Sequence, residues 1–194
     1  MAIDEQTLLR TAGLSALIAI VALIVSGVTI ALFFGGAGDF WGPVNDMAVA
    51  VTLVALILPV VAVDHVAKPD VGVWLRIVSL AAIAGMVLAA VGQLLLVGKV
   101  ISLETSFVTG GIGIVPVFVW LIGVAILALG QGILPTYLGW LAAGVIVLSA
   151  TLAVIASIAM GPAVVVVSVA LLAVLAGWLG SLGMTLLGRA TASN

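Results

Sequence analysis

Charged residues interrupt this chain at only a few points, and between them the sequence is almost wholly apolar. The uncharged runs cover residues 11–38, 47–63, 77–98 and 105–188. A helix that crosses a lipid bilayer needs about 20 apolar residues. Each of the first three runs therefore predicts one membrane span, and the fourth is long enough for three.

Two groups of turn-forming residues divide the long fourth run. Gly130-Gln131-Gly132, followed by Pro135, marks one turn, and Met160-Gly161-Pro162 marks the other. We therefore predict one domain, residues 1–194, that contains six spans. Their approximate bounds are 9–34, 44–63, 73–97, 111–130, 136–159 and 163–187.

The apolar runs are typical of helices and not of barrel strands. Strands of a membrane barrel alternate apolar and polar residues, whereas segments such as 51–63 and 164–175 are apolar on every face. A helix also satisfies its own backbone hydrogen bonds, which lipid cannot do. The expected fold class is all-α: a polytopic integral membrane bundle of six transmembrane helices.

Composition narrows the classes of function. The chain is 65% hydrophobic and 6% charged, whereas a soluble domain carries about 25% charged residues. A net charge of −2 offers no basic face to nucleic acid. The chain has no cysteine, and His65 is its single histidine. We therefore expect no metal site and no cofactor.

The basic residues predict the orientation of the six spans. Both termini and the loops 64–72 and 131–135 fall on one side. That side carries four basic residues, whereas the other side carries one; the four are Arg10, Lys68, Arg76 and Arg189, and the one is Lys99. By the positive-inside rule, both termini are expected in the cytoplasm.

Polar residues gather at the predicted outer ends of the spans and offer one candidate site. One interpretation is a helix start, because Pro43 suits a first turn and Asp46 would complement the helix dipole there. The other is an outward-facing site that binds a cation or a polar head group. Its candidate ligand-binding residues are Asn45, Asp46, Gln93 and Glu104.

Three further features have structural interpretations. Residues 64–70 read as a solvated inner loop, with a docking or pH-sensing patch around His65 as the alternative. The glycines of 110–113, before Pro116, predict a flexible entry to the fourth span. Trp120 and Trp178 fall well inside their spans, where each indole N–H needs a partner.

Small residues recur every four positions on three of the predicted helices. Such stripes allow close helix packing, within one chain or between copies. We therefore expect membrane lipid as a partner, and a homo-oligomer or a larger membrane complex through these faces. The stripes are Ala81, Gly85 and Ala89; Ser149, Ala153, Ser157 and Gly161; and Ala173, Gly177 and Ser181.

The segment from Gly132 to Leu141 contains a Leu-Pro pair, an aromatic residue and a Leu-Gly-Trp run. It resembles a turn found before the fifth helix in small uncharacterised six-helix membrane proteins of bacteria and archaea. The resemblance covers about 15 residues. It implies a six-helix fold in a prokaryotic cell membrane and no known activity or catalytic residue.

No ionisable residue lies in the central part of a predicted span, although proton relays and intramembrane catalysts normally need one. We therefore identify no catalytic residue. The favoured function is an accessory membrane protein or one that binds lipid or another apolar ligand. The alternatives are a small oligomeric transporter or channel, and an enzyme that acts on lipid through Asp46, Glu104 or His65.

Overall fold

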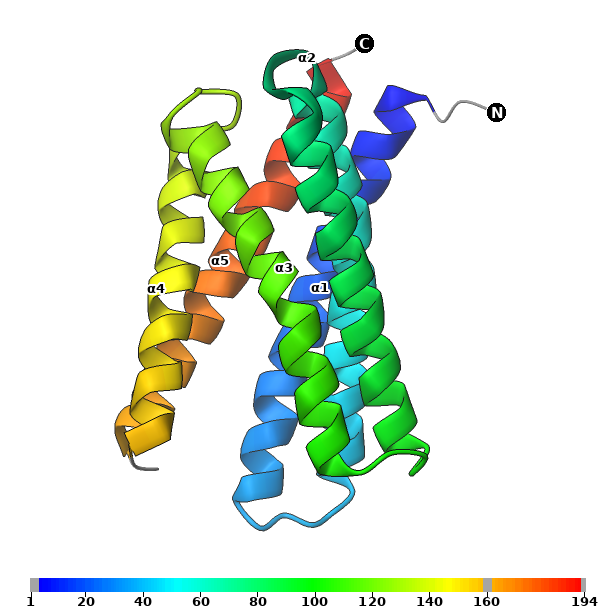
Figure 1. Cartoon of the computed structure of the whole chain (residues 1–194), viewed down its shortest axis with the longest axis vertical. Coiled ribbons are helices and arrows are strands. Elements are labelled where there is room, and N and C mark those ends of the chain that lie inside the picture. The colour runs from blue at the N-terminus through cyan, green and yellow to red at the C-terminus, as the bar shows by residue number, and fades with distance from the viewer. Residues whose placement is uncertain (1–3, 159–161, 193–194) are drawn as a thin grey trace.

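A computed structural model describes residues 4–158 and 162–192, and within these ranges the regular secondary structure is helical throughout (Figure 1). Six stretches of helix are long and apolar enough to cross a membrane, which confirms the predicted all-α class and the predicted number of long apolar helices. The helical elements are α1 (Glu5–Phe34), α2 (Trp41–Val97), α3 (Leu103–Leu129), α4 (Thr136–Ile158) and α5 (Pro162–Ala192).

The long element α2 supplies two of the six stretches. Its halves, Trp41–Ala67 and Val73–Val97, run in opposite directions, and the chain reverses between them (Figure 1). Successive stretches alternate in direction, so both ends of the chain lie at the same end of the bundle. We call this the terminal end, and we call the opposite end, which holds the loops 35–40 and 98–102, the far end.

Several helices extend beyond the predicted spans. The largest difference is in α3, which begins at Leu103 and not at residue 111. The predicted flexible entry at residues 110–113 was wrong, because those glycines and Pro116 lie inside α3. Hydropathy marks the apolar stretch only, whereas a helix continues until its backbone is capped, here by the Ser102 side chain, which accepts a hydrogen bond from the Thr105 N–H.

The other differences are shorter and have the same origin. The first half of α2 begins at Trp41 and stays helical to Ala67, so Asp64 and His65 lie in a helix and not in a loop. The turn predicted after α3 is confirmed, since α3 ends at Leu129 and Gly132 has a φ of +66°. Met160 and Gly161, in the second predicted turn, lie outside the described residues.

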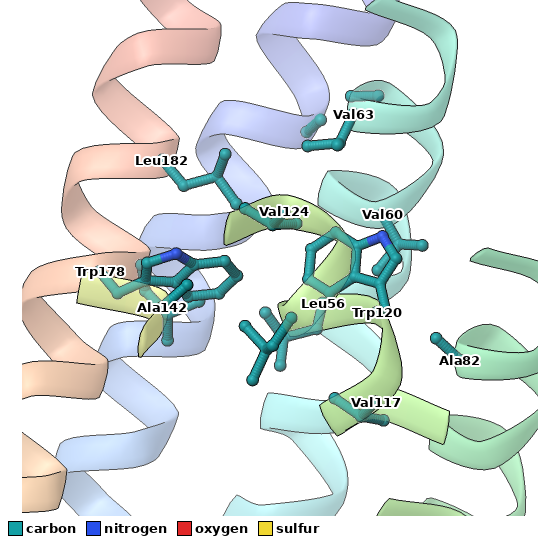
Figure 2. Close-up of a cluster of buried hydrophobic side chains, with 14 of the residues drawn as sticks. Leu56, Val60, Val63, Ala82, Val117, Trp120, Val124, Ala142, Trp178 and Leu182 are labelled. Carbon is teal, nitrogen blue, oxygen red and sulfur yellow. The ribbon is translucent and has the colours of Figure 1, made fainter. Parts of the chain in front are cut away.

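The helices contact one another in a closed order: α1 with α2, α2 with α3, α3 with α4, α4 with α5, and α5 with α1. The core lies where side chains from all five elements meet (Figure 2). At its centre, Trp120 of α3 and Trp178 of α5 pack edge to face, with ring centroids 5.8 Å apart. Both are only 1% exposed.

Packing is uneven along the last two helices. No residue of 146–158 in α4 or of 163–177 in α5 is buried, and in Figure 1 this part of the hairpin diverges from α3 toward the far end. The buried residues of both helices lie in their other halves, among them Leu138 and Leu182. The far halves of α4 and α5 therefore present apolar faces to their surroundings.

One of the three predicted stripes of small residues is a helix contact in the chain. Gly85 and Ala89 pack against Gly113 of α3, so the backbones of α2 and α3 approach closely. In the other two stripes Ala153 and Gly177 are exposed, and Gly161 lies outside the described residues. Association of copies through those two faces stays a prediction.

Candidate functional site

The polar pair Asn45 and Asp46 lies in the second turn of α2, near the far end. The Asn45 amide donates a hydrogen bond to Asp46 Oδ1 over 3.4 Å, and its carbonyl oxygen accepts one from the Ser26 hydroxyl of α1 over 2.7 Å. All three side chains are partly buried. The amide of Asn45 therefore links α1 to the carboxylate of Asp46.

Asp46 does not lie in the first turn of the helix, where the sequence suggested that it would complement the helix dipole. The helix begins at Trp41, so Asp46 is its sixth residue, and the first turn contains no acidic residue. The stabilising effect of the helix dipole is confined to the first turn. Pro43 does lie in that turn, but the dipole gives no reason for a carboxylate at position 46.

The other two candidate residues lie on neighbouring elements. Gln93, in the second half of α2, is partly buried, and its amide nitrogen lies 4.0 Å from where a Cβ on Gly110 of α3 would be. Glu104 is exposed in the first turn of α3, where it complements the helix dipole. No hydrogen bond or ion pair among the described side chains joins either residue to Asp46. A single site built from all four stays a prediction.

An apolar groove of about 550 Å³ lies along the first half of α2. Ser15 and Ile18 of α1 and Leu94 from the second half of α2 also line it. Ser15 is its one polar residue, and the Ser15 hydroxyl already donates to the Ala55 carbonyl over 2.6 Å. The lining from the first half of α2 consists of Met47, Ala50, Val51, Val54, Ala55, Ile57 and Leu58.

Asp46 adjoins the edge of the α2 face that forms this groove. It precedes the lining residue Ala50 by one turn, and residues at this spacing are neighbours on a helix surface. The carboxylate therefore lies beyond the end of the groove that is nearest the far end. The groove and Asp46 together form an amphipathic surface, apolar along most of its length and anionic at one end.

At the terminal end, polar side chains hold helices and loops together. The Arg189 guanidinium donates to the Ile133 carbonyl over 2.6 Å, and the hydroxyls of Tyr137 and Thr185 are 2.9 Å apart. The first contact fixes the loop between α3 and α4 to α5, and the second joins the start of α4 to α5. His65 Nε2 lies 3.9 Å from a carboxylate oxygen of Glu5, and both side chains are largely exposed.

The core contains three polar atoms without a hydrogen-bond partner among the described residues: Nε1 of Trp120, Nε1 of Trp178 and Oγ of Ser79. The sequence indicated that the two indoles need partners, but neither Nε1 has one among the described residues; Figure 2 shows the two rings within the cluster of buried hydrophobic side chains. An unpaired buried donor costs about 1–3 kcal/mol. The two tryptophans therefore stabilise the core by packing, but their unpaired N–H groups destabilise it.

The candidate residues Asp46, Glu104 and His65 do not converge on one site. No three described His, Asp or Glu side chains lie close enough together to hold a metal ion. Of these candidates, Asp46 and Glu104 lie near the far end, whereas His65 lies near the terminal end beside Glu5. An acid–base pair for catalysis needs groups within reach of one substrate, and neither Asp46 nor Glu104 is within reach of His65.

Sequence reasoning found the polar pair and missed the groove. Its lining residues are ordinary apolar residues of a spanning helix, and what makes them a groove is the way α1 and the two halves of α2 pack. Ser26 was missed as well, although a hydroxyl on an apolar helix opposite an asparagine is a weak signal for such a contact.

Comparison with known proteins adds no further indication of function. The chain matches no protein-family model, no curated protein and no solved structure.

Proposed function

We propose that this chain is a multipass membrane protein that binds one acyl chain of a membrane lipid in the groove on α1 and α2. The groove is the observation that carries the proposal. Its lining is apolar except for Ser15, and the Ser15 hydroxyl is occupied by the Ala55 carbonyl. No lining side chain is left to bind water, so the groove suits an alkyl chain.

The dimensions of the groove suit an acyl chain. Its lining on α2 extends from Met47 to Leu58, which at 1.5 Å per residue is about 16 Å. One leaflet contributes about half of a hydrocarbon core that is roughly 30 Å thick. If a methylene group takes about as much space as a water molecule, roughly 30 Å³, a volume of about 550 Å³ holds on the order of 18 of them.

Binding in the groove must compete with the bilayer itself. The hydrophobic effect gives no advantage there, because lipid tails are as apolar as the protein surface. A groove differs from an exposed helix face because it surrounds more of the chain and adds van der Waals contacts along its length. We therefore infer that the groove retains a lipid longer than the exposed faces of α4 and α5 do.

The proposed orientation places both termini in the cytoplasm and the far end outside. Arg10, Arg76 and Arg189 support it, because they lie near the terminal end, whereas Lys99 lies at the far end. Trp74 and Trp140 are exposed near the terminal end as well, in positions that suit a membrane interface. In this orientation, Asp46 lies toward the outer leaflet.

Photocrosslinking tests the proposal. The purified protein would be reconstituted in vesicles that contain a phospholipid with a photoactivatable acyl chain, and the cross-linked peptides would be mapped. We expect cross-links to concentrate on residues 47–58 and to fall several-fold in Val54→Trp, which fills the groove from an exposed position on its rim.

Val165→Trp is the matched control, because Val165 is also exposed, slightly more so than Val54, but lies on α5, outside the groove. It should leave the cross-links on 47–58 unchanged. Equal labelling of all exposed helix faces, in the unaltered protein and in Val54→Trp, would show that the groove binds no lipid preferentially.

A further inference from the structure

The carboxylate of Asp46 accepts fewer hydrogen bonds than its oxygens allow. An ionised carboxylate has two oxygens with about four acceptor positions. The described residues supply one hydrogen bond, from the Asn45 amide to Oδ1, at a long 3.4 Å. The Asn45 carbonyl, which accepts from Ser26, holds that amide in place. The geometry leaves Oδ2 free to accept from a ligand.

Among the described residues, no cation forms an ion pair with this carboxylate. The one ion pair among the described residues joins His65 to Glu5 at the terminal end. The charged residues described near the far end are Asp39, Lys99 and Glu104, all exposed. None forms an ion pair with Asp46. A partly buried carboxylate within a spanning helix is costly unless a positive group approaches it.

The groove determines which positive group can approach. Asp46 lies one turn before Ala50, a lining residue at the edge of the groove. A lipid whose acyl chain occupies the groove would have its head group toward the far end, on the side of Asp46. A protonated amine there supplies both the charge and the N–H donors that the carboxylate lacks, whereas a glycerol head group supplies no charge.

We propose that the groove and Asp46 together select a phospholipid with a primary-amine head group in the leaflet at the far end. This inference rests on the proposed binding of an acyl chain and adds the identity of the head group. The apolar groove does not distinguish lipids that share the same chains. Selectivity therefore comes from the polar end, where Asp46 accepts from the ammonium and Asn45 orients the carboxylate.

The test compares two photoactivatable phospholipids with identical acyl chains, one with an ethanolamine and one with a glycerol head group. A charge-assisted hydrogen bond is among the stronger ones in proteins. We therefore expect the ethanolamine lipid to label residues 47–58 about tenfold more than the glycerol lipid. Asp46→Asn should reduce this ratio to near one, while labelling by the glycerol lipid persists. Asp46→Glu should restore part of the preference.

Asp39→Asn is the control, since it removes a carboxylate from the exposed loop at the same end and should keep the tenfold ratio. Equal labelling by both lipids in the unaltered protein, or an unchanged ratio in Asp46→Asn, would overturn the head-group proposal and leave acyl-chain binding intact. If neither lipid labels residues 47–58 of the unaltered protein more than the other exposed helix faces, the proposed function itself is overturned.

Discussion

Gly85 of α2 and Gly113 of α3 bring the backbones of the two helices into direct contact. A Cβ on Gly113 would lie 2.5 Å from the Gly85 carbonyl oxygen, and a Cβ on Gly85 would clash with Gly113 in the same way. Neither position has space for a side chain. This contact fixes the distance between α2 and α3, and with it the position of Trp120 two turns further along α3.

We expect Gly113→Ala to lower the free energy of unfolding by about 1–3 kcal/mol, because the added methyl group overpacks this contact. Gly111→Ala is the matched control in the same helix, since nothing lies within 4 Å of its Cβ position. It should be neutral or stabilising by up to about 1 kcal/mol through helix propensity. Unfolding titrations in mixed micelles measure both. Equal effects of the two substitutions would contradict the close contact.

The unsatisfied indole of Trp120 leads to a second prediction. Trp120→Phe keeps an aromatic ring but removes the unpaired N–H. The smaller ring makes fewer contacts, which destabilises the protein, whereas the removal of an unpaired buried donor stabilises it. We expect a change in unfolding free energy within about 1 kcal/mol, whereas Trp120→Ala should cost about 3–5 kcal/mol.

Ser79→Ala removes another unpaired polar atom and should likewise be neutral or stabilising. Trp140→Phe, at a position that is 68% exposed, serves as the reference for an indole outside the core. A Trp120→Phe protein as unstable as Trp120→Ala would show that the indole N–H has a partner.

The bond from Arg189 to the Ile133 carbonyl predicts a local effect at the terminal end. Arg189→Met keeps much of the side-chain volume and removes the donor, so the loop at 130–135 should open more often. We expect a loss of about 1 kcal/mol in local stability, measured as faster amide hydrogen exchange in this loop. Arg76→Met, at an exposed position, should leave that exchange unchanged. Identical exchange in both variants would exclude a role for Arg189 in holding the loop.

The proposed orientation can be tested directly because the chain contains no cysteine. Single substitutions Ala37→Cys and Lys99→Cys place a thiol in the loops of the far end, and Gln131→Cys places one at the terminal end. In intact cells, a thiol reagent that does not cross membranes should label the first two and not the third. After lysis, all three should react. The reverse pattern in intact cells would invert the orientation.

The sequence by itself determined the class of the fold and the number of long apolar helices. Runs such as 164–175 are apolar on every face, and only a helix can bury such a stretch in lipid with its backbone bonded. The turn at Gly130–Gly132 was likewise visible, because few other residues tolerate the positive φ found at Gly132. These properties are local, so no knowledge of neighbouring helices was needed.

Helix ends were less accessible to sequence reasoning, and one error affected the candidate site. A start predicted at residue 44 placed Asp46 in the first turn, where the dipole would explain it. The observed start at Trp41 places it beyond that turn. A difference of three residues thus decides whether this carboxylate has an ordinary structural role.

Only the tertiary structure decided which polar residues meet and where the surface is hollow. Ser26 and Asn45 are 19 positions apart, and their hydrogen bond depends on how α1 crosses α2. The groove depends on the same crossing, because an apolar residue such as Val54 looks the same in sequence whether it faces a flat surface or a groove. In a chain that is apolar almost everywhere, hydropathy marks every helix face alike, so packing and not pattern determines the site.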